Sequence, residues 1–146
     1  MTRSQTYLDE QATEIFNKIL ALLGDKDYIE LGDCKCCNKL SVYSLGNGPY
    51  PPSFSKGRFT LAHYTETADI AEPMADPSMD FVVDGDGSIY PQTLRCDWAG
   101  ILEDCTARGG RMSFLDCQLQ EKLADFANNW LKYIASRLNI TLQKGA

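Results

Sequence analysis

The residues best suited to chemistry are the clustered cysteines Cys34, Cys36 and Cys37. Cys34 and Cys37 have the C-x-x-C spacing of a zinc knuckle, and thiolates are the ligands that structural Zn²⁺ prefers. A tetrahedral site needs a second pair, but Cys96 and Cys105 are nine residues apart and form no knuckle of their own. The sequence therefore leaves open a zinc site at Cys34 and Cys37, and reduced loop thiols are the simpler interpretation.

A thiol enzyme is the next hypothesis. A reactive C-x-x-C thiol usually lies at a helix N-terminus, which lowers its pKa, whereas this motif joins two strand-like runs. A Cys–His mechanism would pair Cys37 or Cys96 with His63, the only histidine. Because His63 alternates in phase with Phe59 and Leu61, a histidine with a structural role is favoured. No nucleophile elbow and no phosphate-binding glycine loop is present, so no enzyme class is indicated.

The run Asp84-Gly85-Asp86-Gly87-Ser88 resembles the start of a calcium loop. Such a loop requires glycine at position 6 and a bidentate glutamate at position 12. Counted from Asp84, glycine falls at position 4 and Arg95 occupies position 12. The flanking runs, Met79 to Val83 and Ile89 to Tyr90, are β-branched or aromatic. A tight hairpin turn is therefore predicted instead of a metal site.

The same turn ends an interval of one-sided charge. No lysine or arginine occurs between Arg58 and Arg95, whereas outside this interval 14 bases face 13 acids, so the interval accounts for the net charge of −6. Net negative charge disfavours direct binding to nucleic acid, which needs a basic patch. The acids form either a solvated loop and strand face or a surface that binds a basic protein partner. The predicted partner-binding residues are Glu66, Asp69, Glu72, Asp76, Asp80, Asp84 and Asp86.

Hydrophobic periodicity predicts two amphipathic helices with strands between them. The expected elements are a helix from Thr6 to Leu23, strands at Tyr28–Leu31, Lys39–Leu45 and Arg58–Thr65, a hairpin from Met79 to about Leu94, strand or short helix between Cys96 and Cys105, and a long helix from Ser113 to Leu138. A loop is expected from Glu66 to Pro77 and a frayed tail from residue 139 to 146. The connections are too short for helical crossovers, which parallel pairing would need. The chain is thus expected to form one α+β domain, residues 1–146, with an antiparallel sheet of about four to six strands packed by an N-terminal and a long C-terminal helix.

No secretory signal and no membrane-spanning run is visible, so a cytoplasmic protein of a bacterium or an infected host cell is expected. No cofactor other than zinc is indicated, and a homodimer stays open. No membrane partner is expected.

Two stretches resemble small uncharacterised bacterial and phage-type domains, including the YqiB-like family of unknown function. One is Pro77-Ser78-Met79-Asp80-Phe81, which enters a strand with an acidic turn, and the other is the helical run from Leu123 to Tyr133. The stretch Ala62-His63-Tyr64 is similar to proteins carried by mobile elements. The resemblance implies a context without an assigned activity. The leading hypothesis is a non-enzymatic interaction or regulatory protein that binds a basic partner, as a phage or mobile-element accessory or anti-defence protein.

Overall fold

The computed structural model describes residues 5–32, 39–46, 55–65, 74–105, 116–138 and 140, and for residues 55–56, 64–65, 74–76 and 98 it describes the backbone alone. The described elements, in chain order, are α1 (Glu10–Leu23), β1 (Tyr28–Leu31), β2 (Leu40–Gly46), β3 (Ser55–Thr65), β4 (Met74–Asp84), β5 (Ile89–Cys96), the 3₁₀ turn η1 (Asp97–Ala99), β6 (Ile101–Asp104) and α2 (Cys117–Leu138).

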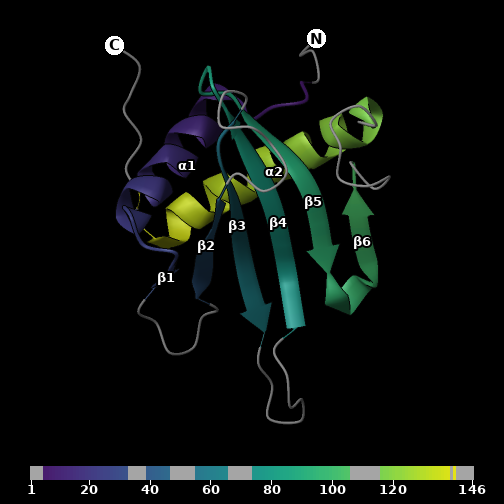
Figure 1. Cartoon of the computed structure of the whole chain (residues 1–146). Helices are drawn as coiled ribbons and strands as arrows, with labels where there is room; N and C mark the ends of the chain where they lie inside the picture. The colour runs from purple at the N-terminus through teal and green to yellow at the C-terminus, as the bar shows by residue number, and fades with distance from the viewer. Residues whose placement is uncertain are drawn as a thin grey trace.

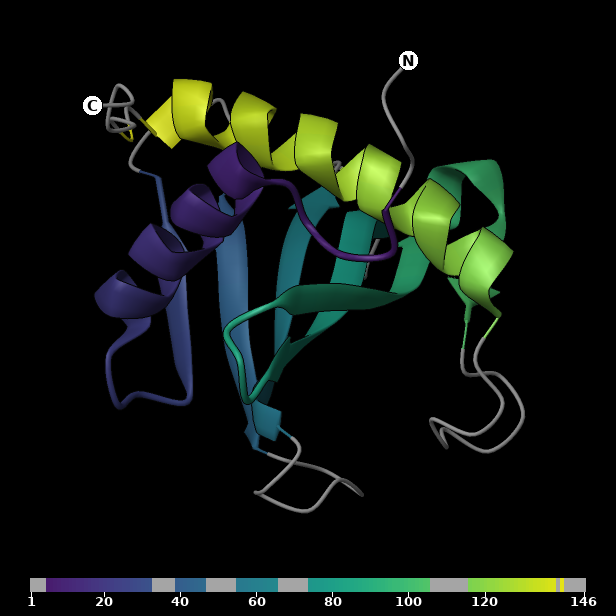
Figure 2. The same ribbon diagram turned by 90° about the horizontal axis from the view of Figure 1, so that it is seen from above.

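The six strands form one antiparallel sheet in which every strand pairs with its sequence neighbours, in the order β1-β2-β3-β4-β5-β6 (Figure 1). Both helices pack on the same face of the sheet and leave the other face without a helix (Figure 2). This is the predicted α+β class, with six strands. The meander arises because short connections allow only antiparallel neighbours.

The first helix begins four residues later than its hydrophobic pattern predicted. Asp9 is its N-cap, with extended backbone and a carboxylate that accepts the Ala12 N–H at 2.8 Å. A cap residue lies outside the helix by definition, so Thr6 to Leu8 approach as an extended segment although Leu8 is buried in the core. The predicted end is confirmed: Gly24 has a φ of +62° and donates its N–H to the Leu20 carbonyl.

The predicted loop from Glu66 to Pro77 was too long, because β4 already begins at Met74. The prolines in this stretch favour a loop rather than a strand. Pro77 is tolerated because the β3–β4 register shifts between Ala62 and Tyr64, where one residue of β3 opposes two of β4. Prolines inside sheets are confined to such bulges and to edges, because they lack the N–H that a ladder needs.

Two other boundaries are settled by hydrogen bonds. The ambiguous run from Cys96 to Cys105 contains both structures that had been considered, the turn η1 and the strand β6. At the start of α2, Asp116 accepts the Leu119 N–H at 3.0 Å and caps the helix, so α2 begins at Cys117, whereas the predicted start, Ser113, lies outside the described residues. At the far end Ile140 donates its N–H to the Ala135 carbonyl and packs against the core, so the predicted frayed tail does not include it.

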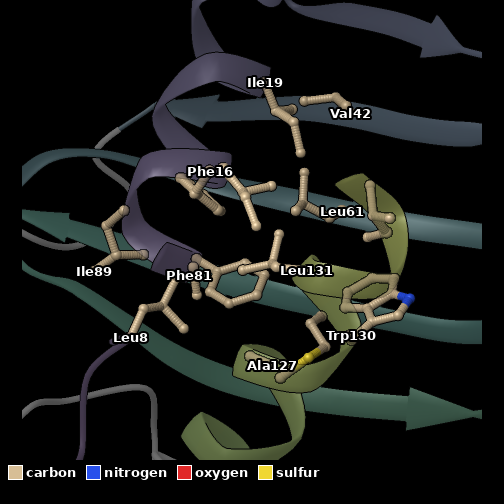
Figure 3. Packing of buried hydrophobic residues seen from close by; sticks show 14 of the residues in the cluster. Leu8, Phe16, Ile19, Val42, Leu61, Phe81, Ile89, Ala127, Trp130 and Leu131 are labelled. Atoms are coloured by element: carbon tan, nitrogen blue, oxygen red, sulfur yellow. The ribbon is translucent and has the colours of Figure 1, made fainter. Parts of the chain in front are cut away.

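The core lies between the sheet and the two helices (Figure 3). At its centre the Phe16 ring of α1 meets the Phe81 ring of β4 edge-on, with centroids 5.0 Å apart. Leu131 of α2 and Leu61 of β3 are fully buried beside them. Every described element except η1 and β6 contributes a side chain to this cluster or packs one against it, so the core fixes how strands β1 to β5 lie relative to the two helices.

Candidate interaction surface

The predicted hairpin turn is confirmed and its aspartates organise it. The Asp84 N–H donates to the Ser88 carbonyl at 2.8 Å, and Gly87, with a φ of +93°, donates its N–H to the Asp84 carbonyl at 3.0 Å. The Asp86 carboxylate accepts the Ser88 N–H at 2.8 Å. The backbone amides of the turn thus donate to the aspartate carboxylates, as in Asx turns.

The extended segment before α1 packs beside this turn. Its Leu8 N–H donates to the Ile89 carbonyl at 2.9 Å, and the Tyr7 ring meets the Tyr90 ring edge-on with centroids 5.8 Å apart. Between the segment and the turn lies an open groove of about 540 Å³, which we call the acidic groove. Its lining residues are Gln5, Tyr7, Leu8, Asp9, Glu10, Thr13, Asp86, Gly87 and Ser88.

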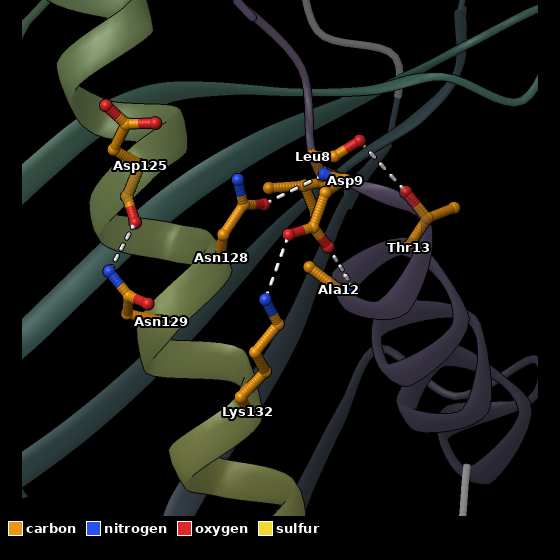
Figure 4. Close-up of polar contacts among 8 residues, drawn as sticks. All are labelled: Leu8, Asp9, Ala12, Thr13, Asp125, Asn128, Asn129 and Lys132. Atoms are coloured by element: carbon orange, nitrogen blue, oxygen red, sulfur yellow. Dashed lines mark hydrogen bonds and ion pairs between the residues drawn. The ribbon is translucent and has the colours of Figure 1, made fainter. Parts of the chain in front are cut away.

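Among the described residues, three carboxylates and no lysine or arginine line the acidic groove. Asp9 is partly neutralised, because its second oxygen lies 3.0 Å from the Lys132 ammonium of α2 while its backbone N–H donates to the Asn128 side chain (Figure 4). Glu10 is exposed in the first turn of α1. Glu10 and Asp86 add two further carboxylates to the negative charge that a molecule in the groove would meet.

The negative charge of the turn also affects the pKa of Tyr90. Burial raises the pKa of the Tyr90 hydroxyl, and the charges of Asp84 and Asp86 raise it further, while a hydrogen bond with Ser88 acts in the opposite direction. The phenol beside the groove thus stays neutral at physiological pH. An edge-packed tyrosine pair next to carboxylates offers a cationic side chain both charge and an aromatic surface.

The structure separates the acids that are contiguous in sequence. The β4 strand runs from Met74 to Asp84, which is about 33 Å at 3.3 Å per residue, so Asp84 and Asp86 lie a strand length away from its beginning. Asp76 lies near that beginning, with only its backbone described. The predicted partner-binding residues Glu66, Asp69 and Glu72 lie outside the described residues.

Asp80 lies midway along β4, on the face of the sheet without helices. Its carboxylate accepts the Thr60 hydroxyl at 2.6 Å, and its backbone N–H donates to the Thr93 hydroxyl at 3.1 Å. The strand registers place it in a polar row that crosses all six strands: Tyr28, Tyr43, Thr60, Asp80, Thr93 and Asp104. Asp80 is therefore part of a cross-strand hydrogen-bonded ladder and is not a neighbour of the groove acids.

The residues of the zinc and thiol-enzyme hypotheses are not brought together in the described part of the chain. Cys34 and Cys37 lie outside it, so the zinc hypothesis stays a prediction. His63 packs edge-on against Trp130 of α2, with ring centroids 5.8 Å apart. Cys96 lies on β5, and since β4 separates β5 from β3, two sheet spacings of about 4.8 Å keep it from His63. Among the described residues no three His, Cys, Asp or Glu side chains gather in a metal-binding group.

Sequence reasoning missed Tyr7, Asp9 and Glu10 as members of this surface. The two acids were visible at the start of the predicted helix, where they complement the helix dipole. The sequence does not predict that the N-terminal segment lies beside a turn some 80 residues later, because that contact depends on a backbone hydrogen bond between Leu8 and Ile89.

No helix in the described part of the chain is both long enough and apolar enough to cross a bilayer. A family model described as a domain of unknown function (DUF6908) matches residues 17–137. No curated protein and no solved structure matches the chain.

Proposed function

Because the chain belongs to the DUF6908 family, which brings no known activity, we propose a function from its geometry: a non-enzymatic interaction protein that binds a basic protein partner at the acidic groove. The observation that supports the proposal is the meeting of Glu10 and Asp86, from opposite ends of the first 90 residues, in one groove whose described lining residues include no lysine or arginine. The setting we propose is the one expected from size and charge, an accessory or anti-defence protein of a phage or mobile element.

A lysine or arginine of the partner would enter between Glu10 and Asp86, beside the Tyr7 ring. Each exposed ion pair contributes about 0.2–1 kcal/mol, so the two carboxylates together account for about twofold to 30-fold in affinity. Electrostatic steering adds to the association rate more than to the final affinity. The interface with the partner must therefore extend beyond the groove, and the groove favours partners that carry a positive charge at this position.

The test is quantitative affinity capture from the native host or its infected culture, with the wild-type protein and a Glu10→Gln/Asp86→Asn variant as baits. Both substitutions remove charge and keep the local structure, since asparagine still accepts the Ser88 N–H and glutamine is a good helix former. We expect the variant to recover the basic partner several-fold less efficiently, with the difference shrinking at high salt.

The matched control is Asp25→Asn/Asp27→Asn, which makes the same change in net charge beyond the other end of α1. Since α1 has 14 residues, this control lies about 20 Å from the groove. It should capture the partner as well as the wild-type protein does. Equal recovery by the groove variant, or equal losses in both variants, would overturn the proposal.

A further inference from the structure

Cys105 and Cys117, on either side of a segment outside the described residues, lie close together in the fold. Cys105 follows β6, and Cys117 is the first residue of α2. The Asp116 N–H donates to the Cys105 carbonyl at 2.8 Å, a contact that holds two Cα atoms about 5 Å apart. Cys117 is the next residue, about 3.8 Å further along the chain. The Cα atoms of Cys105 and Cys117 are therefore no more than about 9 Å apart, and a disulfide forms when the start of α2 closes to within about 7 Å of the end of β6.

The two thiols have opposite surroundings. Cys117 is exposed, whereas Cys105 is only 1% exposed and its thiol donates to the Pro91 carbonyl, with sulfur and oxygen 3.6 Å apart. Burial raises the pKa of the Cys105 thiol to about 12, and the charges of Asp104, Asp116 and Cys117 act in the same direction. A peroxide from solvent therefore reaches Cys117 first, while Cys105 is sheltered.

We propose that Cys105 and Cys117 are a redox-active pair that forms an intramolecular disulfide when a hydroperoxide oxidises Cys117. The Cys117 sulfur attacks the outer peroxide oxygen, the O–O bond breaks, and an alcohol (or water, from hydrogen peroxide) leaves. The resulting sulfenic acid is attacked by the Cys105 sulfur, the S–O bond breaks, and hydroxide leaves with the Cys105 proton as water. Two thiols and one hydroperoxide thus give one disulfide, one alcohol and one water.

The surroundings of Pro91 allow the buried thiol to move. The Pro91 carbonyl also accepts the Gln120 side-chain amide at 3.0 Å. When the Cys105 sulfur turns toward Cys117, that buried carbonyl keeps one donor and no backbone acceptor is left unsatisfied. The disulfide would tie the end of β6 to the start of α2 and restrict the unfolded chain, so the oxidised protein should melt at a higher temperature. This inference is independent of the acidic groove.

The test uses the full native chain, reduced and then treated with hydrogen peroxide. Remaining thiols are blocked, and the protein is digested without reductant for mass spectrometry. We expect a linked peptide pair that joins Cys105 to Cys117 and a melting temperature raised by several degrees. Cys117→Ser, at an exposed position, should abolish both effects without unfolding the protein, and Cys105→Ala should leave a Cys117 sulfenic acid that dimedone traps.

Cys96→Ser is the matched control and should form the linked pair as the wild-type protein does. Two results would overturn the proposal. One is a native wild-type protein in which Cys117 oxidises to sulfinic acid while Cys105 stays a free thiol. The other is linkage of Cys117 to a different cysteine.

Discussion

At the scale of single residues, Asp9 joins the two helices. One of its carboxylate oxygens caps α1 through the Ala12 N–H, and the other lies against the Lys132 ammonium of α2 (Figure 4). The two interactions contribute different amounts to the free energy of unfolding. A cap typically contributes about 1 kcal/mol, whereas a partly exposed ion pair contributes about 0.2–1 kcal/mol. The capping role should dominate.

Substitution at Asp9 separates the two roles. Asp9→Ala should lower the free energy of unfolding by about 1–2 kcal/mol, because both interactions are lost. Asp9→Asn should cost less than about 1 kcal/mol, since asparagine caps a helix as well as aspartate does. Urea denaturation measures both. If the two variants are equally destabilised, the cap contributes nothing and the ion pair with Lys132 accounts for the whole effect.

Cys105 gives the protein a pH dependence with a definite sign. The thiol has an ordinary pKa of 9.0, and burial first, with nearby carboxylates second, raises the pKa in the folded protein to about 12. Between these two values the unfolded chain loses a proton that the folded chain keeps, so deprotonation favours unfolding. The thiol's contribution to stability is complete below about pH 9 and is lost as the pH rises toward 12.

This predicts that the reduced wild-type protein loses stability more steeply between pH 9 and pH 11 than Cys105→Ala does. The comparison between the two proteins removes the titration of tyrosines and lysines, which both share. Chemical denaturation at several pH values provides the measurement. Parallel stability curves for the two proteins would show that the Cys105 thiol is not protected by burial.

At the scale of elements, β4 contributes both to the core and to the polar surface of the sheet. It pairs along its length with β3 and β5, and its Phe81 side chain is fully buried against Phe16 of α1 (Figure 3). Its polar positions face the other side, where Asp80 bonds to Thr60. One strand thus supplies the core, the polar row and the acidic turn, as the period of two in a strand dictates.

Phe81→Ala should therefore lower the free energy of unfolding by about 3–5 kcal/mol, because a large buried ring leaves a cavity. Phe126→Ala on α2 is the control, since that ring is 40% exposed. It should cost about 1 kcal/mol or less. Thermal or urea unfolding measures both, and similar losses for the two variants would contradict the placement of Phe81 at the centre of the core.

At the scale of the whole molecule, the acidic character of the chain is distributed differently in space than along the sequence. The seven acids between Arg58 and Arg95 look like one surface when read in order. In the fold β4 separates Asp76 from Asp84 by about 26 Å, and Asp9 and Glu10 of the N-terminal segment line the groove together with Asp86. Partner selection by charge is therefore expected at the end of the sheet where the β4–β5 turn lies.

The sequence by itself determined the order of the elements and the type of most of them, because side-chain periodicity and turn residues are local properties. It left the number of strands between four and six and the structure of the run from Cys96 to Cys105 open. Even the faces were predictable: Phe59, Leu61 and His63 alternate with Thr60 and Ala62, and the structure puts Phe59 against Phe16 and His63 against Trp130, the helix-covered side. Element boundaries were predicted wrongly where a strand distant in sequence determines them. At Pro77, for example, the bulge depends on the register of β3.

Only the tertiary structure decided which distant residues meet. The pairing of Leu8 with Ile89 creates the acidic groove, and the bond between Asp116 and Cys105 brings two cysteines of different environments together. Neither contact can be predicted from the local sequence pattern, because each depends on how the helices pack on the sheet around the common core. The residues could be read from the sequence, but their neighbours could not.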